Sequence, residues 1–383
     1  MTPLLVLPLA LLLCWAPDEP ALSAHTGGGA LAFSPDGRWL VSHGSEGVHA
    51  WDLATGLEHK LERAFSFPRP VPERHFAFAS EGRDLVLFES GRFVAWTLET
   101  GARLRTSRGP NDFPLFSLLS PDGTTFLTVV APSRVSLHEV SEGTARMLEV
   151  PEGDAGSFTY SARGDRIAGS GLGRGREGWA RAWETRTGRE LLSARVLPTG
   201  RARSLVIQTP PGSLSPDGRI LAVLCAPGTH VPGMPGGPST IQLWEVDSGA
   251  MAGELEGHAG PAWGAAFTSD MKRLATWGAA DLVVWSLEEK KKLLSHPGLI
   301  HGAAFAPDGS AVALVSSPDL LRHKERTLTL VDLASGKDRF SRPPAYVHDV
   351  AFSPDGKRVA VTSDRGISLL DSSTGDEVKP VSR

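Results

Sequence analysis

Short runs of alternating apolar and polar residues recur along most of the chain, and turn-forming residues separate them. In the first unit these runs lie at about Ala30–Phe33, Trp39–Ser42, Val48–Leu53 and Glu58–Arg63. Alternation with a period of two is typical of strands that bury one face. The pattern therefore predicts four strands in this unit, joined in sequence by short connections.

A Ser-Pro-Asp-Gly turn lies between the first two predicted strands. It occupies residues 34–37 and recurs at 120–123, 215–218 and 353–356, with the shorter form Pro-Asp-Gly at 307–309. Proline presets φ for a turn, aspartate hydrogen-bonds the nearby backbone, and glycine takes the left-handed conformation. Apolar alternation flanks each copy, so each copy predicts a tight β-hairpin.

A second motif marks the end of the third predicted strand. The sequence Trp-Asp-Leu-Ala-Thr-Gly at 51–56 is echoed at 96–101, 183–188 and 244–249, and more weakly at 331–336 and 370–375. Aligning both motifs gives eight units, whose tryptophan position holds Trp51, Trp96, His138, Trp183, Trp244, Trp285, Val331 and Leu370. The spacing averages about 46 residues, close to the length of a four-stranded propeller blade.

The repeat predicts the fold class. One four-stranded sheet cannot bury both faces by itself, whereas eight sheets stacked around an axis bury them against one another and leave only short edges. We therefore predict an all-β, eight-bladed β-propeller of four-stranded antiparallel blades over residues 25–383, with seven blades as the alternative if an end unit is incomplete. The last blade closes either sequentially, through residues 376–382, or through residues 21–26.

At this point the residues resemble the WD40-repeat family, with the divergent repeats of its bacterial-type members, over essentially the whole chain after residue 24. Trp51-Asp52, and Gly257-His258 nine residues before Phe267, are the family's marks in this sequence. The resemblance implies a β-propeller that acts as a non-catalytic scaffold for other proteins.

The resemblance also implies a structural hydrogen-bond network of His, Ser or Thr, Asp and Trp within a blade. The sixth unit comes closest, with His258, Thr276 and Trp285 at the expected positions. Asp281 lies only four residues before Trp285, nearer than the family pattern places its aspartate. Most other units lack the full set.

The first 24 residues carry a different signal. Residues 4–16 are almost entirely apolar, too short a run for a membrane span of about 20 residues but typical of an export signal. We expect a signal peptide cleaved after Ala16 or Ala24, or a lipoprotein-type leader with short linker whose Cys14 bears the lipid. Export would place the protein in the periplasm, on the cell surface or outside the cell. A mis-assigned start codon or a buried N-terminal strand is the alternative, because no Lys or Arg precedes the apolar run.

Charge and motifs limit the chemistry. The net charge of −4 gives no whole-chain reason to expect nucleic acid as a partner. The glycine-rich stretch at 169–175 lacks the Gly-Lys-Ser/Thr of a phosphate loop, so we expect a flexible connection there. No Gly-x-Ser-x-Gly elbow occurs, and no histidines show metal-ligand spacing. We therefore expect no catalytic residue, cofactor or metal. A lactonase-like or divergent quinone-dependent propeller enzyme, and a structural component of envelope assembly, remain as alternatives.

The connections between repeat motifs are uneven. Units four, five and seven have long second-to-third-strand connections, and the chain from unit four to unit five is also long. In an antiparallel meander all of these emerge at one end, so the extra chain gathers on one face. We expect a monomeric propeller whose long-loop face binds an acidic or extended protein segment, with arginines and Trp179 as anchors; the alternative is neutral insertions. The candidate residues are Arg174, Arg176, Trp179, Arg201, Arg203, Met234, Arg322, Lys324 and Arg326.

Overall fold

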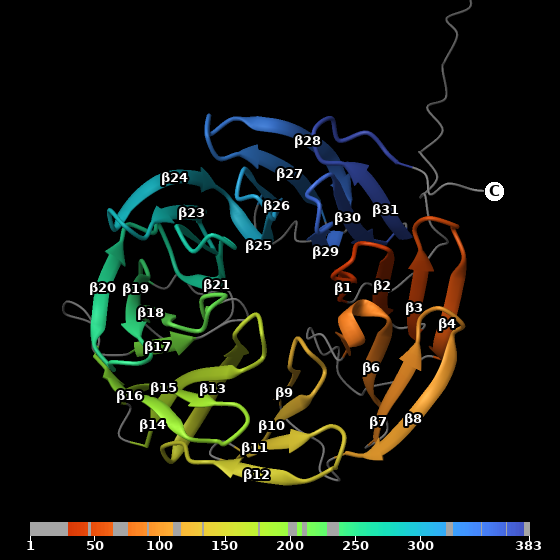
Figure 1. Ribbon diagram of the computed structural model, residues 1–383. Helices are drawn as coiled ribbons and strands as arrows, with labels where there is room; N and C mark the ends of the chain where they lie inside the picture. The colour runs from red at the N-terminus through yellow and green to blue at the C-terminus, as the bar shows by residue number, and fades with distance from the viewer. Residues whose placement is uncertain are drawn as a thin grey trace, which may run out of the picture.

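The structure is a computed structural model in which the sheets form a closed ring around a central axis (Figure 1). It describes residues 30–44, 47–63, 76–89, 92–109, 116–131, 134–174, 177–197, 205–208, 213–227, 237–318, 325–345, 347–364 and 366–378. The leader predicted for residues 1–24, with Cys14, lies outside these ranges, as does the segment 21–26 considered for ring closure.

The first four blades are antiparallel meanders of four strands each. Their strands are β1 (Leu31–Phe33), β2 (Trp39–Gly44), β3 (Gly47–Asp52) and β4 (Glu58–Arg63); β5 (Phe76–Ala79), β6 (Asp84–Glu89), β7 (Arg92–Thr97) and β8 (Ala102–Arg108); β9 (Phe116–Leu119), β10 (Thr125–Ala131), β11 (Arg134–Glu139) and β12 (Ala145–Leu148); and β13 (Gly153–Tyr160), β14 (Arg166–Gly173), β15 (Gly178–Glu184) and β16 (Glu190–Val196).

Blades five to seven repeat this order, and blade eight has three named strands in the part of the chain that is described. The strands are β17 (Leu205–Gln208), β18 (Ile220–Pro227), β19 (Thr240–Glu245) and β20 (Met251–Glu256); β21 (Ala262–Phe267), β22 (Arg273–Gly278), β23 (Asp281–Ser286) and β24 (Lys291–Pro297); β25 (Leu299–Phe305), β26 (Ala311–Ser317), β27 (Arg326–Asp332) and β28 (Asp338–Ala345); and β29 (Val347–Phe352), β30 (Arg358–Ser363) and β31 (Gly366–Asp371). The prediction of an eight-bladed propeller is confirmed.

The predicted tryptophan position has one structural meaning in all eight blades. It is the penultimate residue of the third strand, from Trp51 in β3 to Leu370 in β31. At every such position except His138, the side chain joins the apolar cluster shared with the preceding blade. Trp285 of blade six thus packs against blade five, and Trp51 of blade one packs against blade eight. The repeat therefore marks the contact between blades.

The core is divided among the blade interfaces. Each pair of neighbouring blades shares one apolar cluster in the described residues, and buried aliphatic side chains from both sheets supply it. Because no blade buries both faces alone, each sheet depends on the two beside it.

Glycines in the turns allow the close approach that this stacking needs. A Cβ on Gly82, in the first turn of blade two, would lie 3.0 Å from Cδ of Pro35 in the first turn of blade one. Gly37 meets Pro354 of blade eight in the same way, at 3.4 Å. The turn proline and glycine therefore form the hairpin and also allow close contact between the turns of these neighbouring blades.

The ring closes between blades eight and one. Strand β1 contacts β29 and β30, and the backbone N–H of Leu31 donates to Oδ2 of Asp349 at 2.9 Å. The chain after β31 turns back, so that Glu377 forms a bridge with Leu370 and the N–H of Val378 donates to the carbonyl of Leu369 at 2.7 Å. Residues 376–378 thus begin the fourth strand of blade eight, which supports sequential closure.

The glycine-rich stretch at 169–175 is not a loop over most of its length, and this prediction was wrong. Residues 169–173 belong to β14 and pair with both β13 and β15. A Cβ on Gly169 would lie 2.4 Å from the ring of Phe158, and one on Gly156 would lie 2.2 Å from the carbonyl oxygen of Ser170. The glycines therefore make room for an aromatic ring and for close strand approach.

Blade six contains the polar network that the family resemblance implies. The indole N–H of Trp285 donates to Thr276 Oγ1 at 2.7 Å, and that hydroxyl lies 2.6 Å from Nε2 of His258. On the other side of the ring, Nδ1 of His258 lies 2.7 Å from Oδ1 of Asp281. If the Thr276 hydroxyl donates to Nε2 of His258, and Nδ1–H of His258 donates to the Asp281 carboxylate, each of these polar side chains has a hydrogen-bond partner. Asp281 belongs to the network despite its short spacing from Trp285.

Replacing Thr276 by valine tests this network. The exchange keeps the side-chain shape but leaves the buried Trp285 N–H without its acceptor, which costs about 1–3 kcal/mol. We expect chemical denaturation of T276V to show a loss of that size in the free energy of unfolding. Thr106→Val on exposed β8 is the control, and equal stability of T276V and T106V would contradict the role of the network.

The same network predicts a pH dependence. Burial opposes ionisation of Asp281, but the hydrogen bonds from His258 and from the N–H of Ala259 outweigh burial and lower the pKa of Asp281 from its ordinary value. A lowered folded-state pKa gives stability that is complete above the unfolded-state pKa and is lost as the pH falls through the folded value. The advantage of the wild type over Asp281→Asn should therefore be constant above pH 5 and shrink below about pH 4. An advantage that is unchanged in acid would refute this assignment.

Candidate functional site

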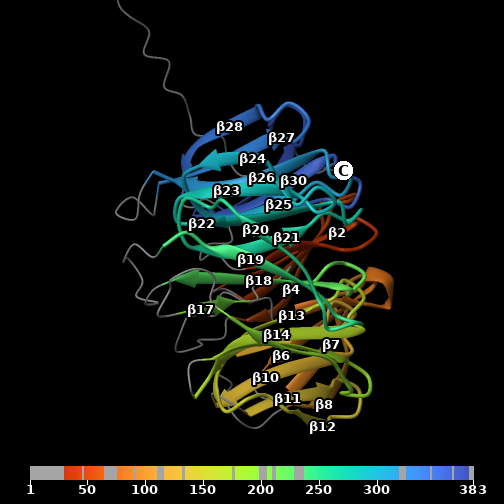
Figure 2. The ribbon, with the colours of Figure 1, turned by 90° about the vertical axis from the view of Figure 1, so that its left-hand side faces the viewer.

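The ring has two faces, which differ in how regular their connections are (Figure 2). The turn face carries the first-to-second and third-to-fourth strand turns, such as residues 34–38 and 53–57. The loop face carries the second-to-third strand connections and the links between blades. On the loop face β18 ends at Pro227 and β19 begins at Thr240, whereas β2 ends at Gly44 and β3 begins at Gly47.

The predicted long connections are found in blades five and seven, but blade four differs. Most of its added residues lengthen β14 and β15, which leave only residues 174–177 between them. The long link from blade four to blade five also contains strand β17, so part of it is sheet. Leu214, directly before the turn at 215–218, forms an isolated bridge with Leu221.

Two of the predicted loop-face residues can be placed on that face. Arg174 is exposed, and its Nη1 lies 3.0 Å from Oε2 of Glu152, which is also exposed. Arg326, at the start of β27, donates from Nη1 to the carbonyl of Val347 at 2.7 Å. The remaining candidates lie outside the described residues: Arg176, Arg201, Arg203, Met234, Arg322 and Lys324.

Trp179 is not an exposed anchor, so that part of the prediction is corrected. Its side chain is only 4% exposed, and it packs against Phe158 with ring centroids 6.4 Å apart. It joins the apolar cluster between blades three and four, together with Leu148 and Trp183. The residue is buried because β15 extends past it, so it lies within the sheet rather than in a loop.

A polar group near the loop face escaped the sequence analysis. The charge of Arg326 acts on His348 at the start of β29, and Nε2 of His301 in β25 lies 2.8 Å from the hydroxyl of Ser317. Burial and the charge of Arg326 lower the pKa of His348, with Asp364 acting in the opposite direction. These residues are far apart in sequence, and no motif links them.

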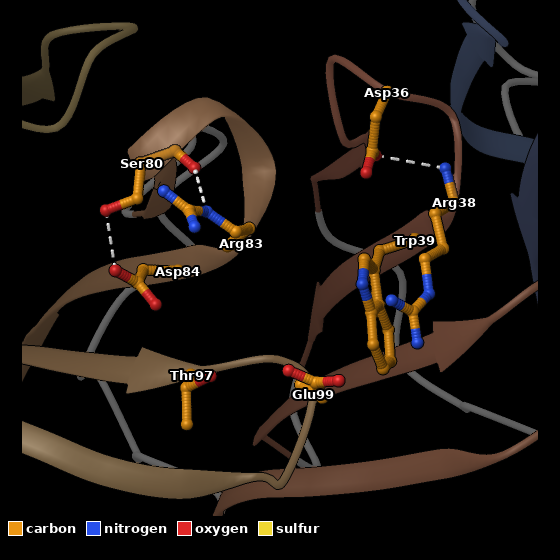
Figure 3. Close-up of a pocket in the computed structure, with 8 residues that line it drawn as sticks. All are labelled: Asp36, Arg38, Trp39, Ser80, Arg83, Asp84, Thr97 and Glu99. Carbon is orange, nitrogen blue, oxygen red and sulfur yellow. Dashed lines mark hydrogen bonds between the residues drawn. The ribbon is translucent and has the colours of Figure 1, made fainter.

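The turn face holds a pocket of about 390 Å³ between blades one and two, here called the turn-face pocket. Its lining residues are Asp36, Arg38, Trp39, Ser80, Arg83, Asp84, Thr97 and Glu99. Figure 3 shows Arg38 and Trp39 on one side, and Ser80, Arg83 and Asp84 across from them. No motif in the sequence predicts a site on this face.

Most charged groups of the turn-face pocket are held by local contacts. The Nε and Nη2 atoms of Arg38 donate to Oδ2 of Asp52 at 3.2 and 2.9 Å. Burial disfavours the ionised form of Asp52, but the N–H of Ala54 and the Arg38 guanidinium outweigh it, so the pKa of Asp52 is lowered. On the opposite wall, the Ser80 hydroxyl donates to Asp84 at 2.6 Å.

The pocket borders a turn that departs from the repeat. Blade two has the 3₁₀ turn η1 (Ser80–Gly82), with φ of 52° at Ser80 and 58° at Glu81, where most blades have Pro-Asp-Gly. Residues other than glycine rarely adopt such values. The missing turn motif in unit two was the sequence signal that could have drawn attention to this place.

The described residues offer little other chemistry. They contain no group of three or more His, Cys, Asp or Glu side chains that could hold a metal ion. Burial raises the pKa of Cys225 to about 12, so its thiol is a poor nucleophile at neutral pH. No helix among these residues is long and apolar enough to cross a membrane.

Comparisons with known proteins agree with this architecture. A family model described as "WD domain, G-beta repeat" matches residues 15–52 and 337–371. The crystal structure of the computationally designed Ika8 protein superposes with a TM-score of 0.65 at 17% identity, over 91% of this chain and 98% of that one. At this identity the likeness concerns the fold alone.

A curated relative matches a shorter stretch. Centriole proteome protein 16 of Chlamydomonas reinhardtii is 43% identical over 77 residues, which are 18% of this chain and 3% of that protein. The chain thus matches only a small part of that relative's length.

The ring of antiparallel sheets defines the class of protein, which is an eight-bladed β-propeller. The two family-model matches, together with the ring of eight blades, support a WD40-repeat β-propeller. Propellers of this kind commonly serve as scaffolds that bind proteins or peptides.

Proposed function

We propose that the protein is a non-catalytic interaction module, exported from the cytoplasm, that binds an acidic or extended protein segment through its loop face. The observation that carries this proposal is that the strand connections differ between the two faces. Turns of the turn face stay short around the ring and most of them keep one hydrogen-bond pattern, whereas loop-face connections differ in length from blade to blade. Variable loops on a rigid scaffold are where proteins place recognition residues.

The charge on this face favours an acidic partner. Arg174 is 80% exposed, and its ion pair with the exposed Glu152 is worth little in water, so a partner carboxylate can replace Glu152. Arg326 is fixed at the inner edge of the face by its bond to Val347. The sequence adds Arg176, Arg201, Arg203, Arg322 and Lys324 to the same connections. Arginine suits this role because its planar fork binds carboxylates through two hydrogen bonds.

Charge reversal tests the loop face. We expect Arg174, Arg176, Arg201 and Arg203, all changed to Glu, to abolish capture of the partner that the wild type retains from its native source. The matched control changes four exposed cations of the turn face, Arg189, Arg219, Lys272 and Lys357, to Glu. Mass spectrometry of the captured proteins decides the result. Undiminished capture by the loop-face variant, or equal loss in the control, would argue against the proposal.

Export has its own test. The apolar run at residues 4–16 supports a cleaved or lipid-bearing leader. N-terminal sequencing and intact mass of the protein from its native source should give a mature chain that begins at Pro17 or His25, or a lipid-modified Cys14. A chain that still begins at residue 1 or 2 would rule out this processing.

A further inference from the structure

One blade interface shows how this propeller binds an arginine within itself. Arg166, the first residue of β14 in blade four, reaches into blade five on the turn face. Its Nη1 donates to the carbonyl of Gly218 at 3.2 Å and lies 2.8 Å from Oδ1 of Asp247. Gly218 lies in the first turn of blade five and Asp247 in its third-to-fourth strand turn. The guanidinium therefore bridges the two turns of the next blade.

A second interface repeats half of this arrangement. Arg273, the first residue of β22 in blade six, donates from Nη1 to the carbonyl of Gly309 at 2.9 Å, and Gly309 is the turn glycine of blade seven. An arginine at the start of the second strand is thus a recurring way to fill the space between neighbouring blades. Blade seven has Ala334 where blade five has Asp247, so Arg273 lacks a carboxylate partner there.

The turn-face pocket occupies the same place between blades one and two. Trp39 is the counterpart of Arg166, because each begins the second strand and each donates its backbone N–H to the turn serine, Ser34 or Ser161. Gly82 corresponds to Gly218, since each is the turn glycine of the following blade.

Glu99 corresponds to Asp247, because each lies three residues after its blade's tryptophan. The hydrogen bonds support this register: the N–H of Leu98 donates to the carbonyl of Arg83, as the N–H of Val246 donates to that of Arg219. The blade-two side of the arginine site is therefore present.

The arginine itself is missing at this interface. Trp39 is only 2% exposed and forms a wall, so it does not reach Glu99 as Arg166 reaches Asp247. Glu99 is exposed and makes no hydrogen bond or ion pair with any described residue. Arg38 is held by Asp52, and Arg83 donates from Nε to the carbonyl of Ser80. Arg38 and Arg83 line the cavity of about 390 Å³ with three carboxylates, Asp36, Asp84 and Glu99, and neither arginine forms an ion pair with Glu99.

We propose that the turn-face pocket binds an arginine side chain presented by a partner protein. The guanidinium takes the place that Arg166 occupies at the interface of blades four and five, with Glu99 as its carboxylate and Asp84 and Asp36 adding negative charge nearby. A guanidinium fits better than an ammonium because it can bridge two acceptors through separate N–H groups. This site lies on the opposite face from the proposed loop-face contact, so it is a second and independent binding surface.

Ligand-observed NMR titration with Nα-acetyl-arginine methylamide tests the proposal on the full chain. The corresponding citrulline compound has the same shape without the charge, and the lysine compound has the charge without the planar fork. We expect saturable binding of the arginine compound, binding at least about tenfold weaker for lysine, and none for citrulline. Equal binding of citrulline, or no saturable binding of arginine, would overturn the site.

Two isosteric variants locate the binding. Glu99→Gln should weaken binding of the arginine compound about tenfold, because it removes the charged acceptor. Asp247→Asn removes the corresponding carboxylate where Arg166 already occupies the site, and it should leave the affinity unchanged. Unchanged affinity in E99Q, or an equal loss in D247N, would refute the assignment. The loop-face charge-reversal variant should retain arginine binding, which separates this result from the proposed function.

Discussion

Contact between the apolar faces of neighbouring blades is the interaction on which this structure depends. Each interface has its own buried cluster, and residues of both sheets contribute to it. Side chains at the tryptophan position pack against the preceding sheet, as Trp51 and Trp183 show. Stacking also requires the turns to approach closely, and the contact of Gly82 with Pro35 shows how little space remains. The turn face is therefore constrained all around the ring, while the loop face is free to vary.

Polar networks add to this packing unevenly. Only blade six joins histidine, threonine, aspartate and tryptophan in one chain of hydrogen bonds among the described residues. Blade three keeps a shorter version, in which Thr128 Oγ1 lies 3.0 Å from Nε2 of His138. In blades seven and eight, the tryptophan position holds Val331 and Leu370, which pack without a polar partner. Apolar stacking is thus sufficient for most blades.

The sequence predicted the features that repeat. Eight turns and eight tryptophan positions carry a period, and a period can be recognised without knowing any contact. The predictions were wrong where a glycine or a tryptophan makes a packing contact that is not part of the repeat. Gly169 looked like part of a loop but makes room for Phe158, and Trp179 looked exposed but lies in the core. Glu99 was not predicted as a site residue, because the cavity that it lines is formed with Trp39, which lies sixty positions earlier in the chain and in the neighbouring blade.

A propeller of similar blades offers the same space at each interface, so its specific sites arise where one blade departs from the others. The interface of blades one and two differs in two ways near the turn-face pocket: the first turn of blade two is η1 instead of Pro-Asp-Gly, and blade one has Trp39 where blades four and six have Arg166 and Arg273. Together they leave a carboxylate facing a cavity on the face where the fold tolerates least variation. Because stacking holds both walls, the pocket is preorganised, and a ligand there loses little free energy to ordering the protein.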